Sequence, residues 1–298
     1  MIAAFFGNLG IAIAKLVGFF VTRSTGMLAE SVHSFADTGN QALLFLGGNR
    51  ARREPTAAHQ FGYGRERYFW SFAVALVLFS MGGLFALYEG IDKLRHPHEV
   101  DKVWVAIAIL VLGLVLEGNA LRIAVNEARH SKGDESWWRF VRRSRQPELS
   151  VVLLEDTGAE IGLALALVGV VVADRTGDAR WDALGSIAIG VLLIVIAIVL
   201  MVEMKSLLIG ESAGTSDQAA IVAALEGSND VDQIIHIRTQ HIGPDEILVA
   251  ANVEYDSALT FDEVSVAIAV TEQNIRAAVP AAKLIYIEPD LRREPGAD

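Results

Sequence analysis

Five polar side chains recur every three or four positions in an otherwise apolar stretch, residues 27–48: Glu30, His33, Asp37, Asn40 and Gln41. In an α-helix, His33 and Asp37 lie one turn apart on the same face. An ionisable side chain is costly at membrane depth unless it has a partner or faces a wet cavity. The stripe therefore indicates a functional interior face, with a seam of hydrogen bonds between helices as the plainer alternative.

A second apolar stretch, residues 149–173, carries Glu155, Asp156 and Glu160. Asp156 and Glu160 share one helix face, whereas Glu155 is rotated by about 100° from Asp156. Imidazole and carboxylate groups from two facing helices make a donor set suited to a divalent first-row metal. Together the two stretches predict a metal site with four candidate ligands: His33, Asp37, Asp156 and Glu160. Glu155 is expected to pair instead with a basic residue, with Lys15 as the candidate.

Two features of the composition exclude other kinds of site and partner. There is no cysteine, which excludes disulfides, thiolate zinc sites and thiol nucleophiles. The sequence pI of about 5.1 argues against a nucleic-acid partner, which would require a basic face. Zinc suits a tetrahedral set of nitrogen and oxygen ligands, with Mn²⁺, Fe²⁺ and Co²⁺ as alternatives.

The elements that must position these ligands are predicted to be membrane-spanning helices. Of the 298 residues, 52% are hydrophobic, and the mean hydropathy of +0.39 is unusual for a soluble domain. A span needs about 20 mostly apolar residues. Six stretches qualify as transmembrane helices: residues 2–22, 27–48, 68–91, 103–125, 149–173 and 183–204.

The distribution of Lys and Arg predicts the orientation of these helices. Five arginines lie between residues 50 and 67, and six Lys or Arg lie between 129 and 145, whereas the alternate loops carry fewer. Positive residues favour the cytoplasmic side, so both termini are expected there. The first stretch lacks a basic leader and a small-residue cleavage site, which favours a span over a signal peptide. We expect a multi-pass protein in the lipid bilayer of a bacterial-type cell membrane.

The C-terminal part differs in composition from the rest. Residues 211–298 carry 16 Asp and Glu against five Lys and Arg, which accounts for the whole net charge of −11. The pattern predicts helices over 215–225 and 261–278 and strands over 231–239, 246–255 and 283–287. The expected organisation is therefore a transmembrane domain over residues 1–208 and an αββαβ domain over residues 209–298.

Four segments of the chain closely resemble the cation diffusion facilitator family, which includes the ZnT-type zinc transporters. They are LAESVHSFADTGNQ (28–41), FGYGRERYFWSF (61–72), LYEGIDKLRHP (87–97) and LLEDTGAEIG (153–162). The resemblance implies six transmembrane helices, a cytoplasmic ferredoxin-like domain and a homodimer. It also implies the exchange of a divalent cation, commonly zinc, for protons.

The family's metal ligands carry over in part. The pair in its second span falls on His33 and Asp37, and the second member of the pair in its fifth span falls on Asp156. The first member of that pair would fall on Val152, which cannot bind a metal. Either three protein ligands and a water hold the cation, or Glu160 completes the set.

These observations favour a proton-coupled efflux transporter of divalent metal cations, with zinc as the leading cargo. The departure at Val152 leaves a second hypothesis open, a non-transporting member that acts as a metal-responsive heteromeric partner. An intramembrane metalloenzyme would use similar ligands to activate water. The chain has no His-Glu-x-x-His motif, so we do not expect it to be an enzyme.

Overall fold

The computed structural model describes residues 2–133, 136–143 and 147–291, and the chain divides into two compact units. The first comprises Met1–Arg50 and Glu66–Lys205, and the second comprises Ala51–Arg65 and Ser206–Asp298. The C-terminal residues 292–298 of the expected αββαβ domain lie outside the described residues. Each unit is described below by itself.

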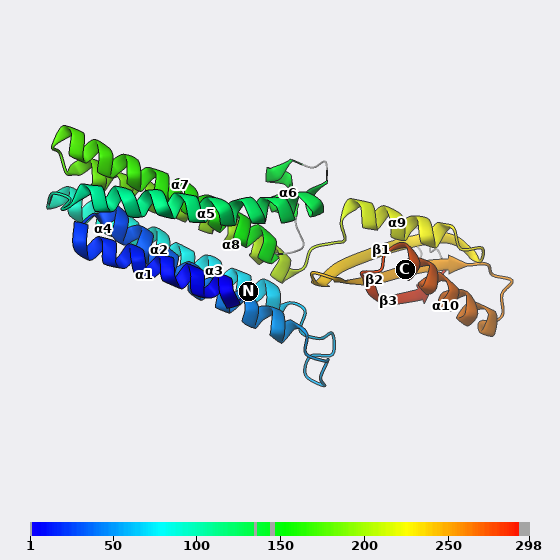
Figure 1. Ribbon diagram of the computed structural model, residues 1–298. Coiled ribbons are helices and arrows are strands. Elements are labelled where there is room, and N and C mark those ends of the chain that lie inside the picture. Colours follow the sequence, from blue (N-terminus) through cyan, green and yellow to red (C-terminus); the bar gives the residue numbers. More distant parts are fainter. Residues whose placement is uncertain (1, 134–135, 144–146, 292–298) are drawn as a thin grey trace. The chain divides into compact units, whose positions relative to one another are not determined.

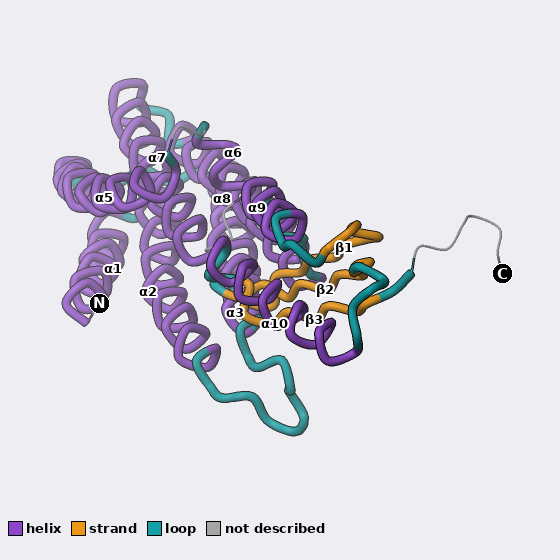
Figure 2. Tube along the Cα trace, turned by 90° about the vertical axis from the view of Figure 1, so that its right-hand side faces the viewer, coloured by secondary structure: helices purple, strands orange, loops and turns teal. Residues whose placement is uncertain are grey.

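The first unit is a bundle of long helices that run side by side (Figures 1 and 2). Its elements are α1 (Ile2–Thr22), α2 (Thr25–Ala51), α3 (Glu66–Val77), η1 (Leu78–Leu84), α4 (Phe85–Arg95), α5 (Val103–Lys132), α6 (Trp137–Arg143), α7 (Pro147–Thr176) and α8 (Arg180–Ile209). Helix α5 packs against α7 and α1, and α3 packs against α7.

Within the described residues, four helical stretches are long and apolar enough to cross a membrane: Glu66–Arg95, Val103–His130, Pro147–Thr176 and Arg180–Ile209. The first of these joins α3, η1 and α4. Helices α1 and α2 have 21 and 27 residues, which is sufficient length for a span. Within α1 the segment Leu9–Thr22 is also apolar, and the polar stripe lowers the hydropathy of α2. The chain is thus a helical membrane-type protein, as expected.

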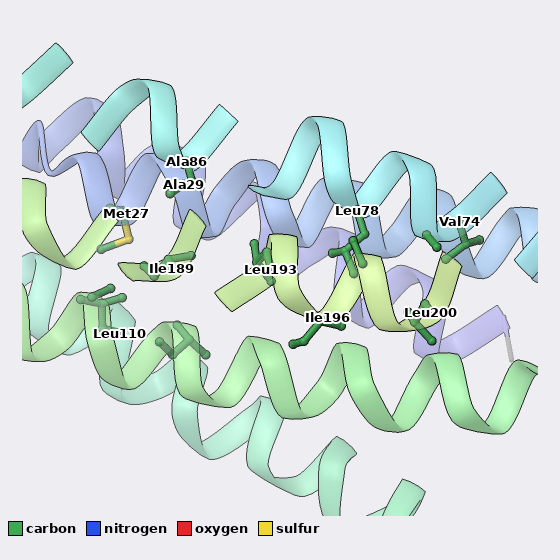
Figure 3. Close-up of a cluster of buried hydrophobic side chains, with 14 of the residues drawn as sticks. Met27, Ala29, Val74, Leu78, Ala86, Leu110, Ile189, Leu193, Ile196 and Leu200 are labelled. Atoms are coloured by element: carbon green, nitrogen blue, oxygen red, sulfur yellow. The ribbon is translucent and has the colours of Figure 1, made fainter. Parts of the chain in front are cut away.

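The interior of the bundle is formed by apolar side chains from α2, α3, η1, α4, α5, α7 and α8, several of which are labelled in Figure 3. Glycines bring α4 and α8 into close contact. A Cβ on Gly90 would lie 2.8 Å from the backbone nitrogen of Ile187, and one on Gly190 would lie 2.7 Å from that of Leu87. Small residues allow this approach, which is how membrane helices gain packing energy. Helices α4 and α8 therefore form a tightly packed pair.

The third apolar stretch is not one regular α-helix. Between α3 and α4 the chain forms the seven-residue π-helix η1, in which Leu78, Gly82 and Gly83 are buried. A π-helix is rare and occurs often at functional sites. The sequence predicted an unbroken helix over residues 68–91, because hydropathy does not distinguish the two hydrogen-bonding patterns.

The second unit contains a three-stranded sheet in the order β1-β2-β3. Its elements are α9 (Thr215–Glu226), β1 (Val231–Gly243), β2 (Glu246–Tyr255), α10 (Phe261–Ala278) and β3 (Ala282–Pro289). Strands β1 and β2 are antiparallel, and β2 and β3 are parallel. This order of elements is the predicted one.

One face of this sheet carries both helices. Alternate residues of β2, from Ile247 to Tyr255, are buried together with Ile221 of α9 and Ile275 of α10. Since side chains alternate between faces along a strand, α9 and α10 cover the same face (Figure 2). Thr260 starts α10 with a capping box to Glu263, whose pKa is lowered by the hydrogen bonds that it accepts from Thr260.

Candidate metal centre

His33 and Asp37 lie together inside the helical bundle. His33 is fully buried, and its Nε2 atom lies 3.4 Å from Oδ2 of Asp37, one helical turn further along α2. Neither ring nitrogen of His33, nor Oδ1 of Asp37, makes a hydrogen bond within the described part of the chain. Buried polar atoms almost always have partners, so unpaired donor atoms of this kind fit a ligand. An imidazole nitrogen beside a carboxylate is a suitable pair for a divalent cation.

Helix α7 carries two carboxylates, Glu155 and Asp156, that lie close enough to Asp37 of α2 to interact with it electrostatically. Glu155 Oε1 also accepts a hydrogen bond from Asn40 Nδ2 at 2.6 Å, which ties the two helices together. Like charges facing each other in an apolar surrounding are stabilised when a cation lies between them.

Glu160 lies elsewhere on α7. Its Oε1 atom would be 3.4 Å from a Cβ added at Gly118 of α5, and it interacts electrostatically with Glu117 and Lys15. No group of three or more His, Asp or Glu side chains is close enough to hold a metal ion in the described ranges. Of the four candidate ligands, the structure brings His33 and Asp37 into direct proximity and places Asp156 within electrostatic range. Glu160 faces α5.

The structure supplies different partners for Glu155 and Lys15 from those expected. Lys15 Nζ donates a 2.7 Å hydrogen bond to Ser34 Oγ and lies 3.3 Å from Glu30 and 3.5 Å from Glu117. The expected pairing of Lys15 with Glu155 is therefore wrong, because Lys15 on α1 meets α2 and α5 rather than α7. A sequence signal for the true pairing existed in Glu30, which belongs to the polar stripe one turn before Ser34.

The π-helix η1 lies against the candidate ligands. A Cβ added at Gly82 would be 3.8 Å from His33 Nδ1, so the missing side chain leaves room beside the imidazole. Sequence reasoning did not find this contact, since no local pattern connects residue 82 with residue 33.

Position 152 has an apolar role. Val152 packs against a buried cluster that includes Ala124 and Ala128 of α5, Phe140 and Val141 of α6, and Leu153 of α7. The residue that stands where the resemblance would put a fourth ligand thus contributes to the packing of α5, α6 and α7.

Comparison with known proteins extends this description. A family model for the cation efflux transmembrane domain matches residues 1–209. The proton-coupled zinc antiporter SLC30A9, mitochondrial, of Xenopus laevis is 34% identical over 244 residues, which cover 81% of this chain and 44% of that protein. Metal tolerance protein C4 of Arabidopsis thaliana is 29% identical over 243 residues, or 81% of this chain and 53% of the relative. Zinc transporter ZitB of Escherichia coli is 27% identical over 198 residues, or 65% and 57%.

The chain spans about half the length of the curated relatives that it matches. The expectation of a bacterial-type cell membrane gains no support from them, since the SLC30A9 proteins carry a mitochondrial name. The match over residues 1–209 is to a family of cation transporters, not of enzymes, which confirms the expectation from the sequence. The match of the cation efflux model over residues 1–209 agrees with the apolar helical bundle and with the buried His33 and Asp37 inside it. The chain belongs to the cation diffusion facilitator family of cation-efflux proteins.

Proposed function

We propose that this protein is a proton-coupled efflux transporter of divalent metal cations, with zinc as its principal cargo. The observation that carries the proposal is the buried pair of His33 and Asp37, whose ring nitrogens and Oδ1 atom make no hydrogen bond within the described residues and whose carboxylate lies within electrostatic range of Asp156. The relatives named as zinc antiporter and zinc transporter support the choice of cargo.

The proposed membrane arrangement has six spans. Helices α1 and α2 would cross the bilayer beside the four apolar helices, because Lys15, Glu30 and Glu117 join them to α5 inside the bundle. We place both termini in the cytoplasm, in accord with the arginines between residues 50 and 67. We also assign the second unit to a ferredoxin-like cytoplasmic domain, and the whole protein to a homodimer.

The exchange of metal for protons follows from the chemistry of the ligands. Only a neutral imidazole binds a metal, so a cation that enters the site displaces a proton from His33 when the ring is protonated. A carboxylate loses its proton in the same way on binding. Metal and protons therefore compete for the same atoms, and alternate exposure of the site to the two sides of the membrane would couple their fluxes.

Flux in proteoliposomes tests the proposal. The full chain is reconstituted and assayed with Zn²⁺, Mn²⁺, Fe²⁺ and Co²⁺ under an imposed pH gradient. We expect His33→Ala, Asp37→Ala and Asp156→Ala each to abolish flux without preventing membrane insertion. His96→Ala is the control, because His96 is an exposed histidine that pairs with Asp92 outside the candidate site. Wild-type flux in an alanine variant of one ligand would remove that residue from the site.

A second candidate function is favoured by Val152. If the apolar packing of this residue leaves too few ligands for transport, the protein would act as a metal-responsive partner of another family member. Metal binding by the purified chain without flux in any of the four metal assays would support this candidate. Flux of any one metal that depends on His33 would exclude it.

A further inference from the structure

Six polar side chains are buried at the end of the bundle where α1 passes into α2, α4 ends and α8 begins. They are Thr22, Ser24, Thr25, Lys93, Asp182 and Ser186. Segment ends are usually in contact with water, and burial of polar groups there has to be offset by specific hydrogen bonds.

Asp182 of α8 caps the first turn of α2. Its Oδ2 atom accepts hydrogen bonds from the backbone N–H of Thr25 at 3.0 Å and from the Thr25 hydroxyl at 3.1 Å. Its Oδ1 atom accepts a bond of 2.8 Å from Ser24 Oγ, which in turn accepts from the N–H of Met27. The first N–H groups of a helix have no partner within it, and a side chain just before the helix usually satisfies them. Here a carboxylate 157 residues away in the sequence satisfies one of them.

Lys93 compensates the charge of this cap. Its Nζ atom lies 2.8 Å from Asp182 Oδ2, and both side chains are almost completely buried. The ammonium also donates to the backbone carbonyl of Arg23, in the turn between α1 and α2. Arg23 has a φ of 56°, in the left-handed region. The start of α2 is thus attached to α4 through Lys93 and to α8 through Asp182.

This attachment has a consequence for the candidate metal centre. The close approach of Gly90 and Gly190 makes α4 and α8 a tightly packed pair, and Asp182 fastens α2 to that pair. His33 follows Thr25 by eight residues, which is about 12 Å along a helix. Metal–ligand distances tolerate errors of only about 0.2 Å, so the axial position and rotation of α2 matter for binding.

We propose that Asp182 is a positioning residue for metal binding. By capping α2 from α8, it sets the position of His33 and Asp37 relative to Asp156, and Lys93 allows the carboxylate to be buried. The part that concerns metal rests on the proposed function, whereas the part that concerns the position of α2 does not.

Two double variants separate the cap from the ion pair. Both contain Lys93→Met, which removes the buried cation and fills its volume. One adds Asp182→Asn, which keeps an oxygen acceptor for the Thr25 N–H, and the other adds Asp182→Ala, which removes it. Neither variant leaves an unpaired buried charge, but the Ala variant also removes the acceptor of the Thr25 N–H, so it is expected to melt a few degrees below the Asn variant.

The position of α2 is measured without metal. The chain has no cysteine, so Gly39→Cys on α2 and Val195→Cys on α8 introduce a unique pair of sites for spin labels. Gly39 has open space around it, and Val195 is exposed. We expect the distance distribution between the labels to be that of the wild type in the Asn variant, and shifted or broadened in the Ala variant. Identical distributions in the two would overturn the positioning role.

Metal affinity is measured on the same variants, without labels, by calorimetry with Zn²⁺ in detergent. We expect binding within about threefold of the wild type for the Asn variant and at least about tenfold weaker binding for the Ala variant. Equal affinities in the two variants would show that Asp182 acts only on stability. A loss of affinity that occurs only together with a large drop in melting temperature would show the same. If the wild type itself binds no Zn²⁺, the proposed function fails, and the label distances still decide whether Asp182 positions α2.

Discussion

The ion pair between Lys15 and Glu30 should stabilise the protein far more than a surface pair of the same kind. Lys15 Nζ lies 3.3 Å from Glu30, and the two side chains are 1% and 0% exposed. In the second unit, Lys283 Nζ lies 3.2 Å from Glu246, with exposures of 54% and 35%. The two pairs have almost the same length and differ in burial, and Lys15 also has Glu117 as a second acidic neighbour.

The perturbation is Lys15→Met. It leaves Glu30 and Glu117 without their cation inside the bundle, and breaking a buried pair by removing one partner costs about 3–5 kcal/mol. The control is Lys283→Met, for which an exposed pair predicts a loss of about 0–1 kcal/mol. In the double variant Lys15→Met/Glu30→Gln, most of the loss should be recovered, because one of the two stranded charges is removed as well.

The assay is unfolding of the full chain in detergent, followed by the helical circular-dichroism signal. Lys15→Met is expected to lower the transition by many degrees, Lys283→Met to leave it nearly unchanged, and the double variant to lie between them. A Lys15→Met transition as high as that of Lys283→Met would refute the reasoning. It would mean that Glu30 and Glu117 find other partners, or are neutral, once the lysine is absent.

Three further predictions concern the metal centre itself. Gly82→Ala should weaken Zn²⁺ binding severalfold, because its Cβ would occupy space beside the His33 ring and crowd Leu193 Cδ1 at 3.2 Å and Leu78 Cδ1 at 3.3 Å. Gly39→Ala, which has open space around it, should leave the affinity unchanged, and calorimetry compares the two variants. Glu160→Gln should lower Zn²⁺ affinity if this carboxylate completes the ligand set, and a loss confined to Glu155→Gln would show that the other glutamate does so. Zn²⁺ affinity should fall as the pH drops from about 7.5 to 6, since protons then compete with the metal for the His33 ring and for the carboxylate ligands. A variant with His33→Asp should show a weaker dependence over that range, and an unchanged profile would assign the proton to the carboxylates.

Much of the secondary structure follows from the sequence alone. Strand β2 and helix α10 begin and end at the predicted residues, 246–255 and 261–278. Their boundaries are marked by local signals, such as the alternating pattern of β2 and the Thr260 capping box of α10. The apolar helices are equally local in origin, because about 20 consecutive apolar residues suffice to indicate a span. The sequence also determined the family and the pairing of His33 with Asp37, which depends only on helical spacing.

The tertiary structure decided which buried charges meet. Lys15 contacts Glu30 and Glu117 rather than Glu155, and Asp182 caps a helix that begins 157 residues earlier. Such pairings depend on how each helix is rotated and how closely its neighbours approach, and no short-range pattern contains that information. The π-helix η1 likewise became visible only in three dimensions, because its apolar sequence is as suitable for an α-helix. Sequence therefore specified the helices and their polar faces, while packing between distant segments selected the partners of Lys15 and Asp182.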